Sequence, residues 1–398
     1  MMSPEDQFRS RFGSDPLLRI EAPGRVNLMG EHIDYLDGCV VPAAIEQRIT
    51  LLAAPGSESG DIEIWSAAQG DRVAKLSTSN ETQRKNPKER WLNYPIGVLA
   101  AYAEHGVTIP GCRVAIMSSV PVGAGLSSSA ALETAMALLI EALSGKSCST
   151  LERALRCQKA EHEWVGVPCG IMDQLSVGAG VEGHVLCIDC QSLDIQAVPF
   201  PKDIQLVVAD SGVKHALADG EYAKRRKDCE TALDQLGATS WREVTLTLVE
   251  QHRDRLGDRL FRRARHAVTE MQRVTDFCAA LKSGQPEKLS ALMRAGHDSL
   301  RHDYEVTCPE LDFLADTGFD FKSRGHFGSR MTGAGFGGAT VHLVHEPVAA
   351  AFVEHLQSCY RKAFGQDLDC FMTRASRGAF VSNSNSEKQS SPLALSAG

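Results

Sequence analysis

The stretch from Gly24 to Tyr35 constrains the fold more than any other part of this chain. It carries two glycines and four side chains with ionisable or imidazole groups, those of Arg25, Glu31, His32 and Asp34. Burying these groups together costs several kcal/mol of desolvation unless they pair with one another or with polar groups of a ligand. The alternative is a solvated turn that carries a cluster of charges. A folded, buried version of this stretch therefore predicts a binding site.

The composition is that of a large globular protein. Hydrophobic residues make up 43% and charged residues 23% of the 398 residues, and this length suggests two or three domains. A formal net charge of -8 gives no overall basic field for nucleic acid or an anionic membrane. Met1 to Arg11 contains no apolar signal segment, and no apolar run approaches the roughly 20 residues of a membrane-spanning helix. We therefore expect a cytoplasmic protein that acts on a small molecule, with no nucleic-acid or membrane partner.

Hydrophobic spacing divides the chain near residue 200, at the connection Pro199 to Pro201. We predict strands at 48–53, 61–65, 112–117, 184–187, 204–210, 339–344 and 370–374. We predict helices at 91–105, 130–144, 151–165, 221–236, 259–282, 286–300, 308–317 and 348–364. The result is an α+β protein with an N-terminal domain over 1–200 and a second domain over 201–378. The Ser/Asn-rich end predicts a disordered tail over 379–398.

A loop rich in glycine and serine joins a predicted strand to the helix over 130–144. Gly123 and Gly125 allow the backbone to approach a ligand, and the free N–H groups and dipole of the following helix favour a polyphosphate. The loop has no Gly-Lys-Ser/Thr ending, so the phosphate-gripping lysine of a Walker A loop is missing. The alternative is an ordinary serine N-cap with glycine hinges. The candidate ATP-binding residues here are Gly123, Ala124, Gly125, Leu126, Ser127, Ser128 and Ser129.

Two further loops carry candidate functional residues. Asp173, in Cys169-Gly170-Ile171-Met172-Asp173-Gln174, can accept or orient the proton of an attacking hydroxyl group, and a nearby Arg25 would lower its pKa. A lone Asp in a turn is otherwise more often a capping residue. The segment Arg330 to Thr340 is a glycine-rich turn that leads into a strand, and on its own it is equally a tight hairpin or a bulge.

These segments, in this order and at these separations, resemble the galactokinases, a family in the superfamily that includes homoserine, mevalonate and phosphomevalonate kinases. The phosphate-loop pattern Pro-x-Gly-x-Gly-Leu-Ser-Ser-Ser-Ala is matched at every fixed position, and the resemblance spans residues 20 to 375. It implies a two-domain kinase fold, with an N-terminal α/β domain of ribosomal-protein-like type, a C-terminal ferredoxin-like domain and the active site between them. It also implies phosphorylation of the anomeric hydroxyl group of α-D-galactose by ATP and Mg²⁺.

The resemblance extends to individual residues. It makes Asp173 and Arg25 catalytic, and it implies sugar contacts by Arg25, Glu31, His32, Asp34, Gly170, Asp173 and Tyr222. It implies that Ser128 and Glu161 hold Mg²⁺, although Glu161 could instead be a solvated helix carboxylate. The turn with Gly333 and Gly335 would close over the active site from the second domain, and Trp91 would lie near the adenine unless it is a core aromatic residue. We expect a monomer that binds galactose and ATP.

Two residues depart from the family pattern. Ile33 stands where many galactokinases have Thr, and Leu36 stands where they have Asn, so two polar contacts near the sugar edge would be lost. A kinase of N-acetylgalactosamine or L-arabinose therefore remains an alternative, as does a silent sugar- and ATP-binding sensor. The sensor has no positive support, because Arg25, Asp173 and the serines are all present. Arg225, Arg226 and Lys227 can simply form a solvated helix face.

Overall fold

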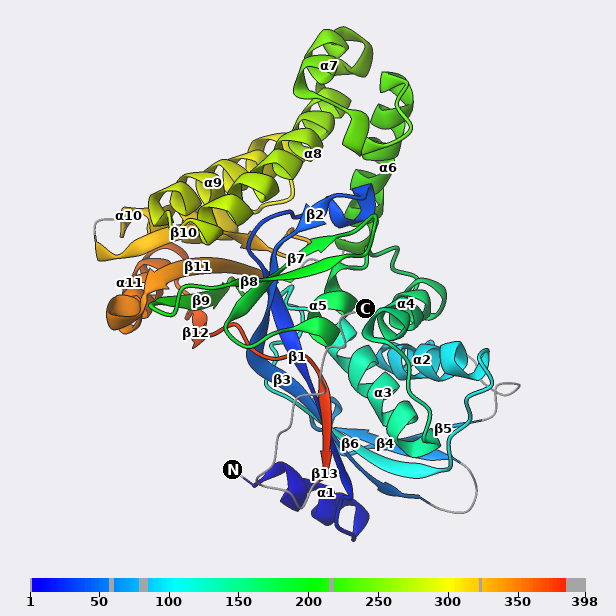
Figure 1. Cartoon of the computed structure of the whole chain (residues 1–398). Helices are drawn as coiled ribbons and strands as arrows, with labels where there is room; N and C mark the ends of the chain where they lie inside the picture. The colour runs from blue at the N-terminus through cyan, green and yellow to red at the C-terminus, as the bar shows by residue number, and fades with distance from the viewer. Residues whose placement is uncertain (1, 57–60, 79–84, 215–217, 322–323, 384–398) are drawn as a thin grey trace.

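The computed structural model describes residues 2–56, 61–78, 85–214, 218–321 and 324–383. Figure 1 shows a sheet with helices beside it in the lower half, a second sheet on the left and a layer of long helices above. No helix in these ranges is both long and apolar enough to cross a membrane.

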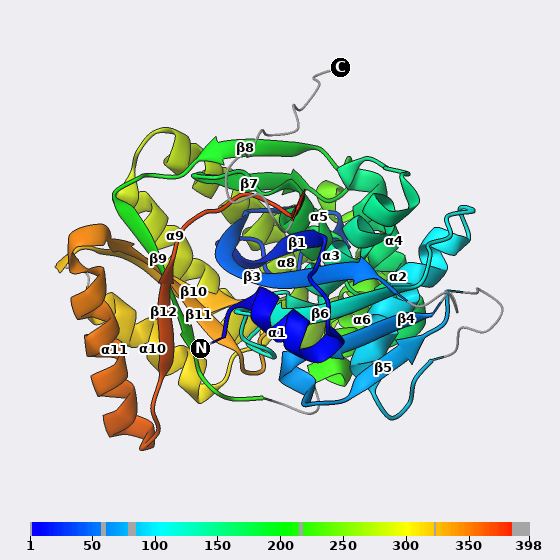
Figure 2. The ribbon, with the colours of Figure 1, turned by 90° about the horizontal axis from the view of Figure 1, so that it is seen from below.

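The first sheet has the strand order β13-β1-β3-β6-β4-β5. Its strands are β1 (Leu18–Asn27), β3 (Pro42–Pro55), β4 (Ile62–Ser66), β5 (Val73–Leu76), β6 (Cys112–Ser118) and β13 (Phe380–Asn383). Along β3 the side chains alternate between two cores: Leu51 belongs to the main core under the helices, and Leu52 packs with Phe8 of α1 (Pro4–Phe12) on the other face. Figure 2 shows α1 in front of β3 and β6, with α2 and α3 behind them.

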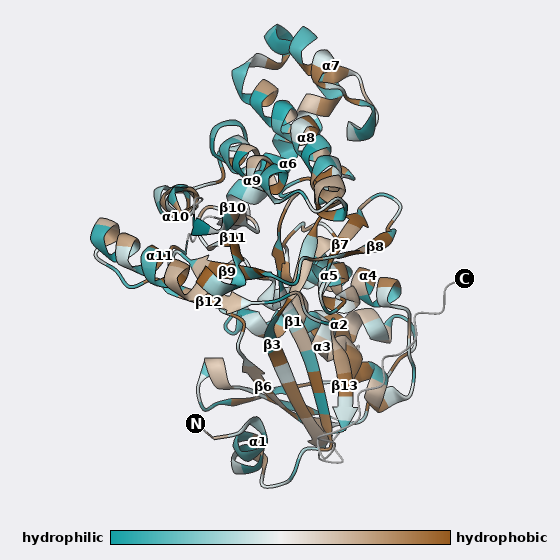
Figure 3. Ribbon diagram, turned by 60° about the vertical axis from the view of Figure 1, so that its left-hand side comes forward, coloured by the Kyte–Doolittle hydropathy of each residue, from teal (hydrophilic) through white to brown (hydrophobic). Residues whose placement is uncertain are grey.

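Helices α2 (Asn93–Ala103), α3 (Ser128–Ser144), α4 (Thr150–Ala160) and α5 (Met172–Ala179) form the helical layer of this half. The helix predicted over 151–165 ends as an α-helix at Ala160 and continues as a π-helical turn over Glu161–Val165. Figure 3 shows the apolar colour along much of β1 and β3, as it does on strands elsewhere in the fold. A small sheet of β2 (Cys39–Val40), β7 (His184–Asp189) and β8 (Ile195–Pro199) follows the first sheet.

The second domain contains an antiparallel sheet with the order β10-β11-β9-β12. Its strands are β9 (Ile204–Asp210), β10 (His326–Thr332), β11 (Ala339–His345) and β12 (Asp369–Thr373). Numbered along the chain, these strands lie in the order 2-3-1-4, and helices follow the first and third of them. This is the ferredoxin-like βαββαβ arrangement, so the predicted fold class is confirmed.

Between β9 and β10 the chain inserts a run of helices, most of which form the upper layer of Figure 1. They are α6 (Ala218–Leu236), α7 (Leu246–Gln251), α8 (Arg253–Lys282), α9 (Pro286–Ser299) and α10 (Pro309–Asp320), and α11 (Ala349–Phe364) follows β11. The change from one sheet to the next falls between β8 and β9, and we keep residue 200 as the proposed domain boundary.

The end of the chain differs from the prediction. Phe380–Asn383 is not disordered but forms β13, which pairs antiparallel with β1 through Leu18↔Asn383 and Glu21↔Phe380. The edge of β1 left open by β3 offers unpaired backbone groups, and this segment satisfies them. The rest of the expected tail, residues 384–398, lies outside the described residues.

The ends of β1 and β10 meet where the two domains join. The Thr332 hydroxyl accepts a hydrogen bond from the Asn27 N–H at 2.8 Å and donates to the Asn27 carbonyl at 3.2 Å. The next residue, Gly333, has a φ of +86°, and a Cβ atom there would lie 2.6 Å from the Gly125 carbonyl oxygen. The glycine-rich turn is therefore the hairpin between β10 and β11, and it packs directly on the loop before α3.

This contact predicts different costs for two glycine substitutions. Gly333→Ala should lower the free energy of unfolding by at least about 2 kcal/mol, because it adds backbone strain and a clash with Gly125. Gly365→Ala is the matched control, since Gly365 has a φ of +69° but no atom within 4 Å of its Cβ position, and it should cost about 1 kcal/mol. Urea unfolding of both variants gives the comparison, and equal losses would contradict the tight packing at Gly333.

Candidate active site

A bidentate ion pair joins the ends of two segments far apart in the sequence. Arg25 Nε donates to Asp173 Oδ1 at 2.8 Å, and Nη2 donates to Asp173 Oδ2 at 2.9 Å. The third guanidinium nitrogen, Nη1, donates to the Gly125 carbonyl at 2.6 Å. Arg25 is buried at the end of β1, whereas 27% of the Asp173 side chain is exposed at the start of α5. Arg25 therefore fixes both the loop before α3 and a carboxylate that a ligand can reach.

Ser127 adds a further donor to the same carboxylate. Its hydroxyl donates to Asp173 Oδ2 at 2.5 Å, and its backbone is left-handed, with a φ of 58°. Ser127 is the N-cap residue of α3, yet it makes no side-chain capping bond. The alternative of an ordinary serine N-cap is therefore wrong for Ser127. The first N–H groups of α3 have no capping side chain and can serve a ligand.

The side chain of Lys214 lies against the loop before α3, and the sequence did not indicate this contact. A Cβ atom on Gly123 would lie 3.3 Å from Cε and 3.7 Å from Nζ of Lys214. Lys214 follows Val213, whose carbonyl accepts a hydrogen bond from the Gly338 N–H at 3.1 Å. The glycine-rich turn thus holds the segment that brings an exposed lysine to the loop. Since Lys214 lies 91 residues after Gly123, no local pattern could have indicated it.

Two buried glutamates lie beside Asp173. The amide of Gln174 donates to Glu161 at 2.9 Å and to Glu133 at 3.4 Å, and the Ser129 hydroxyl also bonds Glu161. Burial and the Asp173 carboxylate raise the pKa of Glu161 to about 7, and burial together with Glu161 raises the pKa of Glu133. The expectation that Glu161 is a solvated helix carboxylate is wrong, because it is buried. The serine that contacts it here is Ser129, whereas Ser128 is half-buried at the start of α3.

A second carboxylate faces Asp173 across the site. Asp34, at the start of a 3-10 helix over Asp34–Leu36, is half-buried, and a Cβ atom on Gly170 would lie only 1.9 Å from its Oδ2. Burial and then the charge of Asp173 raise the pKa of Asp34 to about 7. Position 170 must therefore be glycine for Asp34 to keep this place. The half-buried Tyr222 ring lies 5.2 Å from the ring of Tyr35, measured between centroids.

His32 is buried, and both of its ring nitrogens are occupied. Nε2 lies 2.9 Å from the Ala334 carbonyl and must donate to it, so Nδ1 accepts from the Tyr35 hydroxyl at 2.9 Å. The Tyr35 hydroxyl in turn lies 2.8 Å from that of Tyr304. Burial lowers the pKa of His32 to about 3, so the ring is neutral. In this structure His32 connects the turn after β10 to the tyrosines.

Glu31 lies deeper, 1% exposed, with its Oε2 2.7 Å from Nη2 of Arg330 in β10. Burial raises the pKa of Glu31 to about 7 overall, although the charges of Arg330 and, less strongly, Arg25 lower it. The structure therefore brings together most of the predicted sugar contacts, namely Arg25, His32, Asp34, Gly170, Asp173 and Tyr222, and sets Glu31 beside Arg330.

Two other expectations change. Arg225 is not on a solvated face: it is buried and donates to the carbonyls of Tyr304 and Glu305 at 2.7 and 2.9 Å. Ile33 and Leu36 are 0% and 5% exposed in the main core, so polar residues there would bury a polar group in the core instead of offering a sugar contact. Trp91 is half-buried and packs against the main core.

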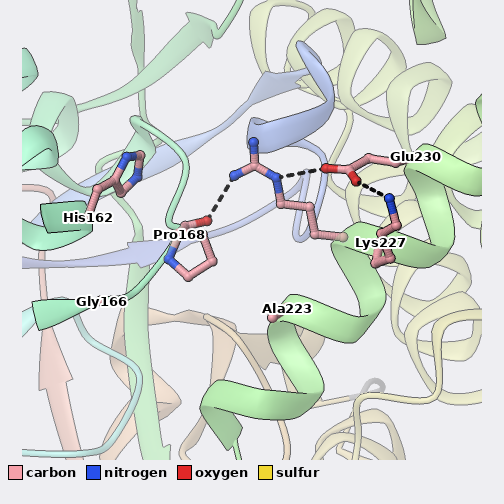
Figure 4. Close-up of a pocket in the computed structure, with 7 residues that line it drawn as sticks. His162, Gly166, Pro168, Ala223, Lys227 and Glu230 are labelled. Atoms are coloured by element: carbon pink, nitrogen blue, oxygen red, sulfur yellow. Dashed lines mark hydrogen bonds and ion pairs between the residues drawn. The ribbon is translucent and has the colours of Figure 1, made fainter.

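A cavity of about 500 Å³ lies beside these residues, between the loop that precedes Gly170 and helix α6. Figure 4 shows it with its lining residues His162, Gly166, Pro168, Ala223, Arg226, Lys227 and Glu230. Arg226 donates to the Pro168 carbonyl at 3.0 Å, so α6 of the second domain is tied to this loop. The cavity is a neighbour of the site and does not contain Arg25 or Asp173.

The arrangement can perform three kinds of chemistry. An uncapped helix N-terminus with a lysine nearby can bind a polyanion. A partly exposed carboxylate with a bidentate arginine can orient a hydroxyl group. Within the described chain, no three carboxylate, histidine or cysteine side chains lie close enough to hold a metal ion by themselves. Glu133 and Glu161 are nevertheless buried beside the partly exposed Asp173, so a divalent cation that is also bound by a polyphosphate would find carboxylate ligands here.

Known proteins share this sequence and fold. The galactokinase galactose-binding signature matches residues 6–55, the N-terminal domain of GHMP kinases matches 93–180, and their C-terminal domain matches 277–362. Galactokinase of Homo sapiens is 41% identical over 380 residues, 94% of each chain, and that of Canis lupus familiaris is 42% identical over 358 residues, 89% of this chain and 90% of that protein. Galactokinase of Lactococcus lactis, solved in complex with galactose, superposes with a TM-score of 0.89 at 32% identity and covers 94% of this chain and 98% of its own. A mevalonate kinase of Methanococcus jannaschii shares the fold at a TM-score of 0.66 and 19% identity. Because relatives more than 40% identical are matched along almost their whole length, the chain belongs to the galactokinase family.

Proposed function

We propose that this protein transfers the γ-phosphoryl group of ATP to the anomeric hydroxyl group of α-D-galactose. The observation that carries the proposal is the Asp173 carboxylate, which Arg25 and Ser127 hold at the uncapped N-terminus of α3. This arrangement supports a phosphoryl acceptor and a polyphosphate next to each other. The proposal places the protein in the cytoplasm as a monomer.

The ATP phosphates would lie on the loop Gly123 to Ser129. The N–H groups of the first turn of α3 and the ammonium group of Lys214 would bind them, and the turn with Gly333 and Gly335 would cover them from the second domain. Trp91 would lie on the adenine side.

Mg²⁺ would be held by carboxylates beside this loop together with the phosphates of ATP. Glu133 Oε1 is buried without a hydrogen-bond partner among the described residues, and Glu161 and Asp173 place further negative charge around it. Ser128 and Glu161 would hold the ion, and Ser129 and Glu133 would orient Glu161. The bound ion would offset negative charge on the phosphates.

Asp173 and Arg25 would act on the acceptor. Phosphoryl transfer has a loose transition state, so positioning and charge stabilisation matter more than early removal of the proton. Asp173 would hold the anomeric hydroxyl group in line and receive its proton as the bond forms. Arg25 would keep Asp173 ionised and offset the charge of the transferring group.

The remaining hydroxyl groups would be read by carboxylates. Asp34 and Glu31 accept hydrogen bonds strongly, and a substrate that lacks the contacted hydroxyl group leaves a buried acceptor unpaired. Gly170 and Tyr222 would shape the pocket, and His32 would fix the turn at Ala334 that borders it. An ADP-release assay with galactose, N-acetylgalactosamine and L-arabinose tests the substrate, and activity only with a sugar other than galactose would overturn it.

Substitution of the acceptor carboxylate should act on turnover. Asp173→Asn keeps the shape but removes the charge and the proton acceptor, so kcat should fall by on the order of a hundredfold or more while the KM for ATP stays within a few-fold. Arg25→Ala should have a similar effect. Asp194→Asn, at an exposed position, serves as the control. A folded Asp173→Asn enzyme with kcat within a few-fold of the parent would remove Asp173 from the mechanism.

Magnesium dependence should follow the buried carboxylates. Glu161→Gln should raise the Mg²⁺ concentration needed for half-maximal activity by roughly tenfold or more. Removal of even a group that only hydrogen-bonds a metal ligand typically lowers metal affinity by about 10- to 100-fold. Mn²⁺ binding followed by electron paramagnetic resonance should weaken in parallel. An unchanged titration curve in both measurements would contradict the metal assignment.

The kcat/KM for galactose should fall at acidic pH. The pKa values of Asp34 and Glu31 are raised to about 7, so below that pH both carboxyl groups become protonated and stop acting as charged acceptors. At saturating Mg²⁺, kcat/KM for galactose should therefore fall as the pH drops below 7, more steeply than a single proton allows, and Asp34→Asn should make the fall shallower. A flat profile from about pH 5.5 to 8 would contradict this reading.

A further inference from the structure

Arg330 is a fully buried cation shared by two carboxylates. It lies in β10 with 0% exposure, and its Nη2 is 2.7 Å from Glu31 Oε2 and 2.8 Å from Glu270 Oε1. Helix α9 leaves room for it through Gly296, where a Cβ atom would lie 2.5 Å from Arg330 Nη1. Arg330 thus connects the second domain to the stretch after β1.

The two carboxylates are used differently. Glu270, on α8, receives a hydrogen bond from Arg330, another from the Gly30 N–H at 2.8 Å, and a third from Arg273 at 2.6 Å. Arg330 and Arg273 therefore hold the pKa of Glu270 well below its usual range. Glu270 is a fully satisfied structural anion.

Glu31 has a cation beside it but open acceptors. Neither Oε1 nor Oε2 accepts a hydrogen bond from another residue in the described ranges, although Oε2 is in ion-pair contact with Arg330. Arg330 Nη2 donates to Glu270 and Nη1 donates to Met29 Sδ at 2.6 Å, and no hydrogen bond from Arg330 reaches Glu31, so the contact with Glu31 is one of charge only. A buried carboxylate with unused acceptors is costly, and a donating hydroxyl group offsets that cost.

We propose that Arg330 is a positioning residue for the sugar, which balances the charge of Glu31 while Glu270 takes its hydrogen bond. Glu31 thereby keeps its acceptor positions for one hydroxyl group of the substrate. This inference rests on the proposed function, because it needs Glu31 to contact the sugar. It also gives the second domain a part in sugar recognition, since Arg330 lies on the strand that ends at the turn with Gly333.

The test compares galactose with a series of deoxygalactoses by kcat/KM, each lacking one hydroxyl group other than the anomeric one that accepts the phosphoryl group. In the parent enzyme, one analogue should lose on the order of tenfold or more, the scale of a hydrogen bond to a charged group, and this loss should shrink to about twofold in Glu31→Gln. That analogue identifies the hydroxyl group that Glu31 reads. Arg330→Lys should reduce the same loss to within about threefold, because lysine cannot serve Glu31 and Glu270 in the same geometry. Its effect on the other analogues and on the KM for ATP should be small.

Arg263→Lys is the matched control. Arg263 is also a buried arginine, 2% exposed, and donates to Glu305 at 2.6 Å and to the Asp303 carbonyl. It should leave the whole deoxy series unchanged. If Arg330→Lys does not fold, Glu270→Gln replaces it: Arg330 then turns its hydrogen bonds to Glu31, occupies the acceptors and lowers the same preference.

The outcomes separate the inference from the function on which it rests. A parent enzyme that uses every deoxygalactose as well as galactose overturns the proposed sugar pocket. If the parent discriminates against one deoxy analogue through Glu31, and folded Arg330→Lys or Glu270→Gln keeps the same discrimination, the result overturns the role of Arg330 alone. A uniform loss in Arg330→Lys, with galactose affected as much as each analogue, would show a merely structural arginine and also overturns it.

Discussion

The contact between Arg25 and Asp173 is the constraint on which the rest of the site depends. It joins the end of β1 to the start of α5 across 148 residues of sequence, and its third guanidinium nitrogen holds the Gly125 carbonyl. Because the arginine is buried, removal of the Asp173 charge would leave an uncompensated cation in the interior. The phosphate loop, the acceptor carboxylate and the first sheet are therefore fixed relative to one another before any ligand binds.

Charge compensation recurs around this pair. Burial, and then the charge of Asp173, raises the pKa values of Asp34 and Glu161 to about 7. Arg330 balances the charge of Glu31 as Arg25 balances that of Asp173, but Arg330 donates no hydrogen bond to Glu31. In the free protein, several carboxyl groups of the site thus have raised pKa values near neutrality. Under the proposed function, sugar hydroxyl groups and a divalent cation would complete their coordination, so ligand binding would relieve electrostatic strain that folding leaves in place.

The sequence predicted the parts of the structure that local patterns encode. The glycines and serines before α3, the long periodic helices and the strand β11 were found because their signals lie within single segments. Strand β1 was missed because Pro23 and Arg25 interrupt its apolar pattern, although a bulge between them keeps its pairing with β3. Strand β13 was missed because Phe380–Asn383 is stable only against the distant edge of β1. The π-helical turn at Glu161 has no sequence signature at all.

In the candidate site, too, local patterns were predictable and contacts between distant segments were not. The resemblance named the residues, but the bond from Ser127 to Asp173, the placement of Lys214 over Gly123 and the sharing of Arg330 between two glutamates are long-range contacts that spacing cannot show.

The central claim is that Asp173 receives the hydroxyl group to which phosphate is transferred. A crystal structure with galactose, Mg²⁺ and a non-hydrolysable ATP analogue tests it most directly. We expect the anomeric oxygen within about 3.2 Å of an Asp173 carboxylate oxygen, with the terminal phosphate at the N-terminus of α3. An anomeric oxygen directed away from Asp173, or phosphates bound elsewhere, would contradict it.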